Sequence, residues 1–401
     1  MNNLQARCLS SLKIPTIVFG ACMAVIAAPA QTLTTLIDFS GSNGASPQAA
    51  LIQGTDGNFY GTTAEGGVSD YYGTVFQLTS AGALNTLYRF CSLANCADGS
   101  FPEAGLVQGT DGNFYGTTQQ GGTNGYGTIF KITSTGALTT LHSFNYANGA
   151  YPQATLLQAP SGTFYSTVRE GGLVGGNGAV FKITPGGVFT ALHSFSGTDG
   201  AYPSAGLVRA ADGNFYGTTE IGGSGTYCGV GTGCGTVFKI TPTGTLTTLH
   251  SFDGTDGSSP VSTLVETSGG FYGTTYQGGS LTCNSPYGCG TVFKITPSGS
   301  LTTLHRFHLT DGDLPGSGLT YGTDGNFYGT TIEGGANEFG TVFEITPAAV
   351  LTTLHSFDNT DGALVIGGLL QASDGTFYGT TDTGGSSDDG TIFRLSLAPA
   401  R

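Results

Sequence analysis

Short runs of alternating apolar and polar residues recur along the chain, and the same phrase appears in every cycle. Phe-Tyr-Gly-Thr-Thr or a close variant begins at seven positions, residues 59, 114, 164, 215, 271, 327 and 377. In the fourth cycle, four runs have strand length and strand composition, at residues 205–209, 214–219, 235–241 and 246–252. Asp-Gly, Gly-Gly and Pro-Thr-Gly sequences lie between these runs and supply turns. Four strands in each of seven cycles predict an all-β fold, a seven-bladed β-propeller of four-stranded antiparallel blades.

The two ends of the repeat region are offset by one strand. Residues 33–39 (LTTLIDF) have a fourth-strand sequence, whereas residues 390–396 (GTIFRLS) have a third-strand sequence. Pairing of these segments would complete the last blade and remove the exposed edge of an open sheet. We therefore predict three-plus-one closure of the ring by the N-terminal strand. A β-solenoid is the alternative, but its coils are usually shorter than these cycles and it needs capping segments.

The repeat is long enough to compare with known families. DGNFYGTT, a Gly-Gly turn, GTVFKITP and LTTLHSF follow one another from Asp212 to Phe252, and nearly the same phrases run from Asp324 to Phe357. In these phrases the chain resembles the GloVer (Gloeo_Verruco) tandem-repeat family of exported bacterial proteins, over the whole region after residue 30. The resemblance implies export and a repeat architecture. It implies no catalytic residues, because the family carries no established activity.

The first 30 residues have the pattern of a secretory signal. Two basic residues precede an apolar stretch at residues 14–28, and Ala28-Pro29-Ala30 is a small-residue cleavage site. We therefore expect a signal peptide at residues 1–30, a propeller domain at residues 31–401, and a secreted protein that is extracellular or periplasmic. No later stretch is long and apolar enough to span a bilayer.

Composition and charge narrow the class of partner. Of 401 residues, 69 are Gly, only 9% are charged, and the formal net charge is −14. Gly inside helices costs about 1 kcal/mol per site relative to Ala, which favours an all-β fold. An acidic surface repels phosphate backbones, so nucleic acid is a poor partner. We expect an extracellular glycan or a surface protein as the partner, and a monomeric chain.

The loops of such a propeller alternate between two faces if the AGLV-type run is innermost and LTTLHSF outermost. The loops of the lower face, which join the first strand to the second and the third to the fourth, are nearly constant. Those of the upper face vary in length and chemistry, as at residues 68–73, 123–127, 173–178 and 386–390. Variable loops on one face of a repeat scaffold usually carry binding. The upper face is therefore the candidate functional face.

Six cysteines after residue 30 fall on that face in three close pairs: Cys91 with Cys96, Cys228 with Cys234, and Cys283 with Cys289. Each pair lies in an insertion that lengthens its repeat. Local disulfides are the natural interpretation in an exported protein, although six cysteines permit 15 pairings. Zinc is the rival, but the inserts contain neither Cys-x-x-Cys nor His.

A two-residue slot after Thr-Thr varies between repeats at the upper end of each second strand. Our candidates for ligand contact lie in this slot: Glu65, Arg169, Glu170, Tyr276, Glu333 and Asp382. Paired carboxylates could serve a glycosidase, and a carboxylate cluster with backbone carbonyls could hold Ca²⁺. Neither has a recognisable ligand spacing, so we assign no metal ligands and no cofactor. The alternative is that these charges only keep the loop rim soluble.

Five of the histidines, at positions 142, 193, 250, 305 and 355, share one repeat position in the outer strand. We expect them to be scaffold residues, partly buried and hydrogen-bonded to backbone. Only His308 breaks the register, beside Asp311 and Asp313, where a metal or acid/base role competes with a solvated loop position. The Asp of each Asp-Gly turn is expected to cap its own turn.

Two classes of function remain. The first is an exported binding or scaffold propeller, favoured because every unusual residue type recurs as architecture. The second is a propeller lyase or glycoside hydrolase that uses upper-face carboxylates such as Glu170 and Glu333. The sequence contains no Ser-His-Asp motif, phosphate loop or nucleotide fingerprint, and we assign no catalytic residue. Repeat three departs most from the consensus, at Ser166, Val168 and Arg169, so a specialised site is expected to include it.

Overall fold

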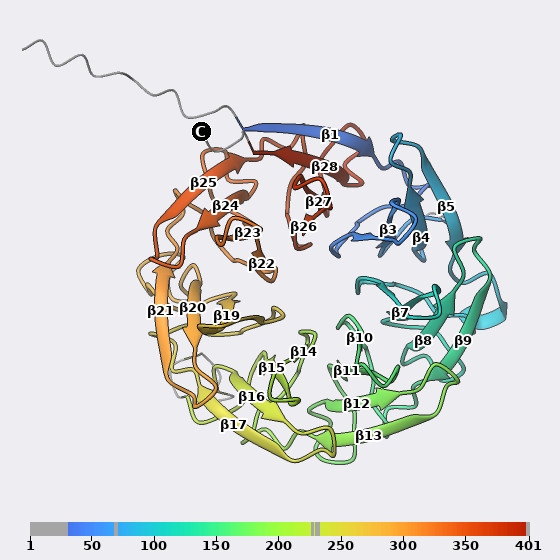
Figure 1. Ribbon diagram of the computed structural model, residues 1–401, viewed down its shortest axis with the longest axis horizontal. Coiled ribbons are helices and arrows are strands. Elements are labelled where there is room, and N and C mark those ends of the chain that lie inside the picture. The colour runs from blue at the N-terminus through green and yellow to red at the C-terminus, as the bar shows by residue number, and fades with distance from the viewer. Residues whose placement is uncertain (1–30, 68–70, 226–227, 229–232, 398–401) are drawn as a thin grey trace, which may run out of the picture.

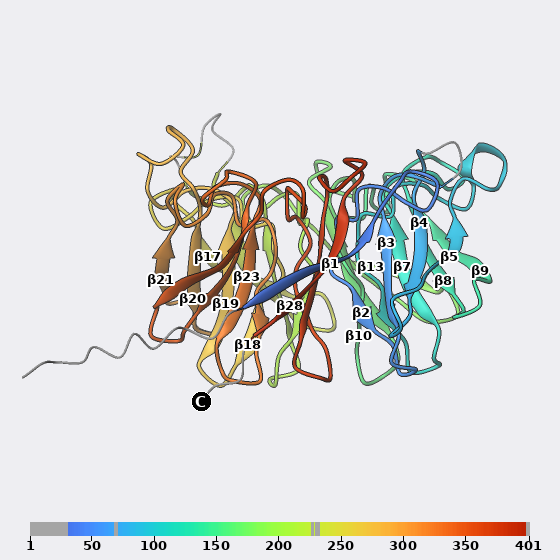
Figure 2. The ribbon, with the colours of Figure 1, turned by 90° about the horizontal axis from the view of Figure 1, so that it is seen from above.

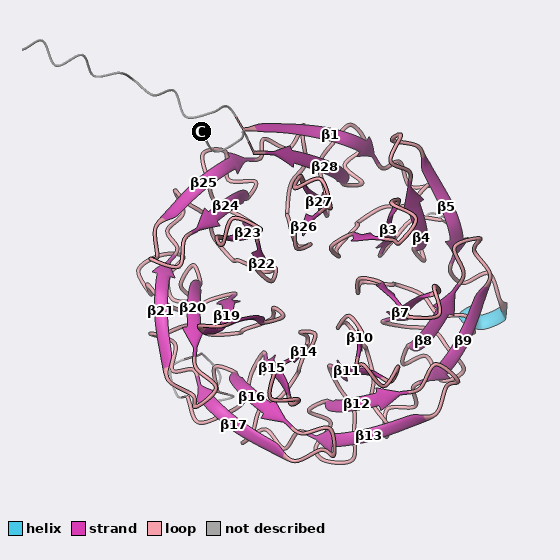
Figure 3. Ribbon diagram, viewed as in Figure 1, coloured by secondary structure: helices cyan, strands magenta, loops and turns pink. Residues whose placement is uncertain are grey.

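The computed structural model places seven four-stranded sheets in a ring (Figure 1). It describes residues 31–67, 71–225, 228 and 233–397. The prediction of an all-β, seven-bladed propeller is confirmed. Within the described ranges the one helical element is a 3₁₀ turn, η2 (Ala94–Cys96), at the outer edge of the ring (Figure 3). No helix in the described part of the chain has the length and apolarity needed to cross a membrane.

Each blade is antiparallel, and four strand positions repeat from the channel outward; blade 1 begins with β2 and blade 7 with β26. The innermost strands are β2 (Ile52–Gln53), β6 (Val107–Gln108), β10 (Leu157–Gln158), β14 (Val208–Arg209), β18 (Val265–Thr267), β22 (Thr320–Tyr321) and β26 (Leu370–Gln371). The second strands are β3 (Phe59–Thr63), β7 (Phe114–Thr118), β11 (Phe164–Val168), β15 (Phe215–Thr219), β19 (Gly270–Thr275), β23 (Phe327–Thr331) and β27 (Phe377–Thr381). The third strands are β4 (Thr74–Leu78), β8 (Thr128–Ile132), β12 (Ala179–Ile183), β16 (Thr236–Ile240), β20 (Thr291–Ile295), β24 (Thr341–Ile345) and β28 (Thr391–Ser396). The outermost strands are β5 (Leu84–Arg89), β9 (Leu138–Ser143), β13 (Phe189–Ser194), β17 (Leu246–Ser251), β21 (Leu301–Arg306), β25 (Leu351–Ser356) and β1 (Thr32–Asp38).

The ring closes by pairing its first strand with its last. Strand β1 runs antiparallel to β28, from Thr32 opposite Ser396 to Asp38 opposite Thr391. Blade 7 therefore consists of β26, β27 and β28 from the C-terminal end and β1 from the N-terminal end (Figure 1). The predicted three-plus-one closure is confirmed.

The Phe-Tyr pair near the start of each second strand links a blade to both of its neighbours. Successive side chains of a strand point to opposite faces, so the Phe and the Tyr contact different blades. In blade 2, Tyr115 packs on Phe164 of blade 3 with ring centroids 4.2 Å apart, and Phe114 receives Tyr60 of blade 1 at 4.0 Å. The same contact recurs at all seven junctions, at 4.0 to 4.3 Å, including Tyr378 against Phe59 where the ring closes.

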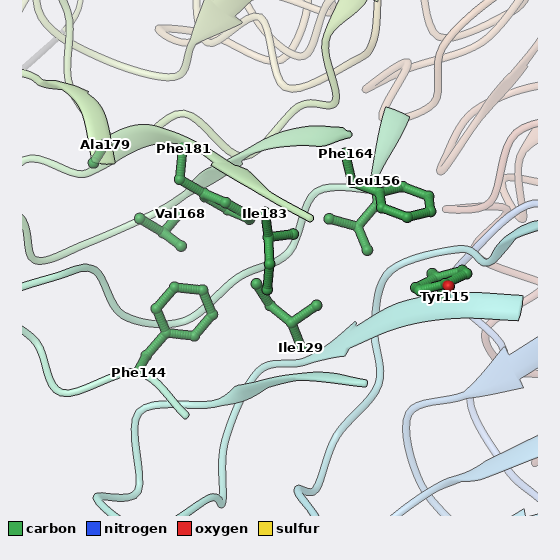
Figure 4. Packing of buried hydrophobic residues seen from close by; sticks show 9 residues of the cluster. All are labelled: Tyr115, Ile129, Phe144, Leu156, Phe164, Val168, Ala179, Phe181 and Ile183. Atoms are coloured by element: carbon green, nitrogen blue, oxygen red, sulfur yellow. The ribbon is translucent and has the colours of Figure 1, made fainter. Parts of the chain in front are cut away.

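Apolar side chains from both blades fill each junction. Between blades 2 and 3, the fully buried Ile129 and Phe144 of blade 2 pack with Phe181 of blade 3 (Figure 4). Packing this dense also explains the Gly of the repeat phrase. A Cβ atom on Gly116 would lie 2.6 Å from Cζ of Phe130, so a larger residue there requires the neighbouring ring to shift. The core of the molecule therefore lies between the blades.

The two Thr residues that end most second strands form the last packed layer below the upper loops. In blade 1, Thr62 Oγ1 donates a hydrogen bond to the Ala104 carbonyl of blade 2 at 3.0 Å. Thr63 Oγ1 lies 2.8 Å from Thr74 Oγ1 on the adjacent strand. These bonds satisfy buried hydroxyls and tie each blade to the next.

The two faces differ as the sequence predicts. On the lower face, Asp212 Oδ1 accepts a hydrogen bond from the backbone N–H of Asn214 at 2.9 Å, which confirms that this Asp caps its own turn. Its Oδ2 also accepts one from the Tyr216 hydroxyl at 2.9 Å, so the turn is anchored to the packed ring. The longer loops rise from the opposite, upper face (Figure 2).

The repeated histidines are half-buried scaffold residues, as expected, but their partners are side chains and not backbone groups. The side chain of the Asp or Asn six residues after each of these His residues lies within hydrogen-bond distance of the His Nε2 atom. The distances are 2.7 to 3.0 Å in blades 3 to 6, for His193–Asp199, His250–Asp256, His305–Asp311 and His355–Asp361. In blade 2, Asn148 takes the place of Asp, 3.1 Å from His142.

We predict that a chain beginning at Phe39, which lacks β1, aggregates. Its β28 edge would carry unpaired backbone N–H and C=O groups able to pair with another copy. Size-exclusion chromatography with light scattering measures the outcome, and a chain beginning at Gln31, which keeps β1, is the control. A monodisperse, folded chain without β1 would contradict the role given to this strand.

We predict that Asp199→Asn destabilises the fold at neutral pH and not in acid. Burial raises the pKa of Asp199, but hydrogen bonds from the Ser196 backbone and hydroxyl and from His193 lower it more, leaving it below its ordinary value. A carboxyl with a lowered pKa stabilises the fold above its unfolded pKa of about 3.9, and this stability is lost as the pH falls through the folded pKa.

Chemical denaturation should therefore show a loss of about 1 kcal/mol for Asp199→Asn at pH 7 that disappears below about pH 3. Because Asn already occupies this position in blade 2, the variant is expected to fold. The reverse change, Asn148→Asp, should gain stability over the same pH range. A difference that does not vary with pH would exclude the charged hydrogen bond as its cause.

Candidate functional site

A cavity of about 700 Å³ lies in the central channel toward the upper face. Its wall is formed by small residues that precede the innermost strands, Ala50, Gly105, Thr155, Gly206, Thr263, Gly318 and Gly368. Neighbouring blades approach closely here: a Cβ atom on Gly206 would lie 2.8 Å from Thr263 Oγ1. Small side chains at this position therefore keep the channel open while the blades touch.

Two sets of variable side chains surround this wall. The first set follows the Pro, or in blade 7 the Val, before each innermost strand: Gln48, Glu103, Gln153, Ser204, Val261, Gly316 and Ile366. The second set is the first slot residue, represented in the cavity by Arg169, Glu220, Tyr276 and Ile332. Backbone hydrogen bonds hold the two sets together, as where the Tyr276 N–H donates to the Ser259 carbonyl at 3.0 Å.

The polar half of the rim is centred on Glu103. Its Oε2 accepts hydrogen bonds from Gln153 Nε2 at 2.8 Å and from Gln119 Nε2 at 3.0 Å. Burial raises the pKa of Glu103, and this outweighs the lowering by Gln153 and by the charge of Arg169. Two amides from neighbouring blades thus fix one carboxyl group at the channel mouth.

Arg169 continues this polar half toward blade 4. Its Nη2 atom lies 3.1 Å from Glu220 Oε2, and its Nη1 atom lies 3.3 Å from Glu170 Oε1. The guanidinium carbon also lies 4.8 Å from the centre of the Tyr202 ring. Two carboxylates and an aromatic face therefore hold the guanidinium in place at the edge of the cavity.

The opposite side of the rim is apolar, built from Val261, Tyr276, Ile332 and Ile366 of blades 5 to 7. Burial raises the pKa of Tyr276, and the charges of Glu333, Asp313 and Glu220 raise it further, so the phenol stays protonated and can donate a hydrogen bond. The cavity thus has one hydrogen-bonding side and one apolar, aromatic side.

A smaller cavity of about 350 Å³ adjoins the first on the polar side. Gln119, Tyr151, Gln153, Arg169 and Glu170 are among its lining residues. Gln153 and Arg169 line both cavities, so the two spaces are neighbours on the polar side of the rim.

The repeat sequence identifies the protein family of the chain. The model of the Gloeobacter/Verrucomicrobia repeat matches residues 20–172, 91–285 and 229–400. The chain belongs to this repeat family. No curated protein matches the sequence.

Several solved structures are similar to this member of the repeat family. A chain of the mitotic checkpoint complex is 11% identical with a TM-score of 0.54, covering 98% of this chain and 100% of that chain. A candidate 6-phosphogluconolactonase from Bacteroides uniformis is 14% identical with a TM-score of 0.51, covering 77% and 84%. A gluconolactonase from Xanthomonas campestris is 12% identical with a TM-score of 0.44, covering 94% and 93%. The two TM-scores above 0.5 indicate a common fold, and identities this low transfer no chemistry.

The structure divides the candidate slot residues into three groups. Arg169 and Tyr276 line the main cavity, and Glu170 lines the smaller one as the ion-pair partner of Arg169. Asp382 lies behind the rim, where its Oδ1 accepts a hydrogen bond from Gln48 at 3.1 Å and burial raises its pKa. Glu65 and Glu333 are exposed and line neither cavity.

Sequence reasoning missed the ring that includes Gln48, Glu103 and Gln153. The signal was present, because this position after Pro varies between repeats as much as the slot does. His308 is exposed, and its backbone N–H donates to Asp311 Oδ1 at 2.8 Å, while that carboxylate pairs with His305. The structure thus gives His308 a loop role.

Disulfides join Cys91 to Cys96, Cys228 to Cys234, and Cys283 to Cys289, as predicted. All three lie in upper-face insertions. Other sequence predictions concern residues 1–30, 68–70, 226–227 and 229–232, including the signal peptide, and these lie outside the described residues.

We predict that Arg169→Gln lowers the free energy of unfolding by about 1 kcal/mol. The change removes two partly buried ion pairs and the contact with Tyr202, and Gln already occupies this slot position in blade 2. Glu170→Gln removes one pair only and should cost less than about 0.5 kcal/mol. Denaturant titration of both variants tests this, and an Arg169→Gln variant as stable as the unmodified chain would contradict it.

Proposed function

We propose that this chain is an exported binding propeller whose ligand, an extracellular glycan, occupies the upper mouth of the central channel. One observation carries the proposal. The packing positions and the small channel wall repeat from blade to blade, whereas the residues around the cavity differ between blades. Variation among the residues that line a cavity, on a scaffold whose packing positions repeat, is expected where a ligand, and not the fold, selects the side chains.

The two sides of the cavity suit a sugar. A sugar ring has an edge of hydroxyl groups and a face of C–H groups. Glu103, Gln153 and Arg169 offer hydrogen-bond donors and acceptors that their partners hold in place. Tyr276 and its apolar neighbours offer a surface on which a sugar face can pack. A volume of about 700 Å³ lies within the range of small-molecule pockets.

Export is part of this proposal. It rests on the signal pattern of residues 1–30 and on the three disulfides, which persist in oxidising compartments and are rare in the cytosol. In that setting glycans of cell surfaces and matrices are accessible partners.

One observation favours hydrolysis or elimination as a second candidate. Burial raises the pKa of both Glu103 and Asp382, as a general acid requires. Against this, Gln119 and Gln153 both bind Glu103, Gln48 binds Asp382, and Arg169 pairs with Glu220. Carboxyl groups held by amides and a guanidinium suit recognition better than proton transfer.

We predict that residues 31–401 bind members of an immobilised panel of bacterial and plant oligosaccharides, and that Tyr276→Ala weakens this binding at least tenfold. Ala occupies the same slot position in blade 1, so the variant should keep the fold. Calorimetry with the best soluble oligosaccharide measures the loss. Tyr321→Gln is the control, because Tyr321 is an exposed Tyr on an innermost strand and Gln occupies its position in four other blades.

Equal binding by Tyr276→Ala together with loss in Tyr321→Gln would place the site on the lower face and contradict the proposal. Chromatography of the same oligosaccharide after incubation distinguishes the two functions. Shortened or unsaturated products that disappear with Glu103→Gln would favour the hydrolase or lyase.

A further inference from the structure

Blade 6 has an acidic residue at a position where each of the other six blades has a small one. The residue paired with the second slot residue is small in six blades, at Ala45, Ser100, Ala150, Ala201, Ser258 and Ala363. In blade 6 it is Asp313, paired with Glu333. The backbone N–H of Asp313 donates to the Glu333 carbonyl at 2.8 Å, and the N–H of Glu333 donates to the Asp313 carbonyl at 3.1 Å.

Asp313 is deeply buried and incompletely partnered. The residue is 1% exposed, and its Oδ2 accepts a hydrogen bond from Asn284 Nδ2 at 3.1 Å, from the disulfide-bonded loop of blade 5. No residue in the described ranges donates a hydrogen bond to its Oδ1. Among the buried side-chain oxygen and nitrogen atoms of these ranges, this is the one atom without a hydrogen-bond partner. A buried carboxylate oxygen without a partner is strongly unfavourable.

Glu333 makes the position less favourable still. Two residues that exchange both backbone hydrogen bonds in an antiparallel pair project their side chains to the same face, with Cβ atoms about 5 Å apart. The two acidic side chains therefore start from the same face of the pair, and like charges on such a pair repel. In blades 1 and 3 the corresponding Glu65 and Glu170 lie opposite Ala, so this repulsion is specific to blade 6.

We propose that Asp313 Oδ1 and the Glu333 carboxylate bind one Ca²⁺ ion at the junction of blades 5 and 6. A hard cation supplies the missing partner of Oδ1 and neutralises both carboxylates. Burial and the charge of Glu333 raise the pKa of Asp313 and outweigh the lowering by the Leu314 backbone and the Asn284 side chain, which fits an acidic group placed beside another without a counter-charge. Glu333 is exposed, so its carboxylate can take up the ion from solvent.

The ligand set indicates the kind of cation. Within the described residues no three His, Cys, Asp or Glu side chains are grouped to hold a metal, so amide, backbone and water oxygens must complete the shell. Ca²⁺ accepts such mixed oxygen shells of irregular geometry, whereas zinc prefers nitrogen and sulfur and Mg²⁺ demands a regular octahedron. With two carboxylates, we expect a dissociation constant on the order of 0.1 to 1 mM, as in extracellular modules.

Thermal unfolding of residues 31–401 in EDTA and in 10 mM CaCl₂ tests the site. We expect Ca²⁺ to raise the melting temperature by about 3 °C, with saturation in the millimolar range, and NaCl at equal ionic strength to leave it unchanged. Asp313→Ala should abolish the shift and should melt at or above the unmodified chain in EDTA. The variant is expected to fold, because four other blades have Ala at this position.

The repeat also provides a matched pair of controls. Glu333→Thr and Glu65→Thr each install the Thr that blade 7 has at this slot position, and they change the net charge equally. Glu333→Thr should lose the Ca²⁺ shift, whereas Glu65→Thr should keep it. The absence of a shift in the unmodified chain, or a full shift in Asp313→Ala, would overturn the proposal. Neither result bears on glycan binding, which the Tyr276 variant tests separately.

Discussion

The contact between the Tyr of one blade and the Phe of the next is the interaction on which the rest of the structure depends. It recurs at all seven junctions, so the blades form a closed cycle in which each second strand is held from both sides. Four of these Tyr hydroxyls also donate to the Asp of the lower turn, at Asp56, Asp111, Asp212 and Asp324. The cycle therefore fixes the lower face as well as the core, which is why the lower turns scarcely vary.

The Tyr–Phe contacts do not fix the residues of the upper face, because the packed layers end at the Thr residues of the second strands. Residues beyond the second Thr of each strand contact loops or the channel, and no neighbouring Phe or Tyr fills their space in every blade. The two variable sets lie at this level, joined by bonds such as that from the Tyr276 N–H to the Ser259 carbonyl. Since those bonds use backbone atoms only, the side chains can change from blade to blade without disturbing the ring.

Sequence reasoning was accurate for most features that recur with the same neighbours, although it gave the repeated histidines backbone partners where the structure has Asp or Asn side chains. Strand order, closure by residues 33–39, the capping Asp residues and the disulfides all follow from local or periodic patterns. It failed where side chains of neighbouring blades meet without a repeating pattern. That Gln119 and Gln153 share Glu103 depends on the approach of neighbouring blades, and no period reveals it. The slot residues were also expected to share one location, yet Arg169 lines the cavity whereas Glu65 and Glu333 do not.

Residues that depart from the repeat differ in whether neighbouring residues compensate for the change. In blade 3, Val168 and Ala179 replace the two hydroxyl partners together, so an apolar pair takes over the packing of the Thr pair. Ser166 replaces Gly, but its hydroxyl donates to the Ala154 and Thr155 carbonyls. These changes compensate one another, because replacing both members of a hydrogen-bonded pair by apolar groups is nearly neutral. Asp313 has a partner only for Oδ2, from Asn284, and the buried Oδ1 atom that the fold leaves without one points to a partner from outside the chain.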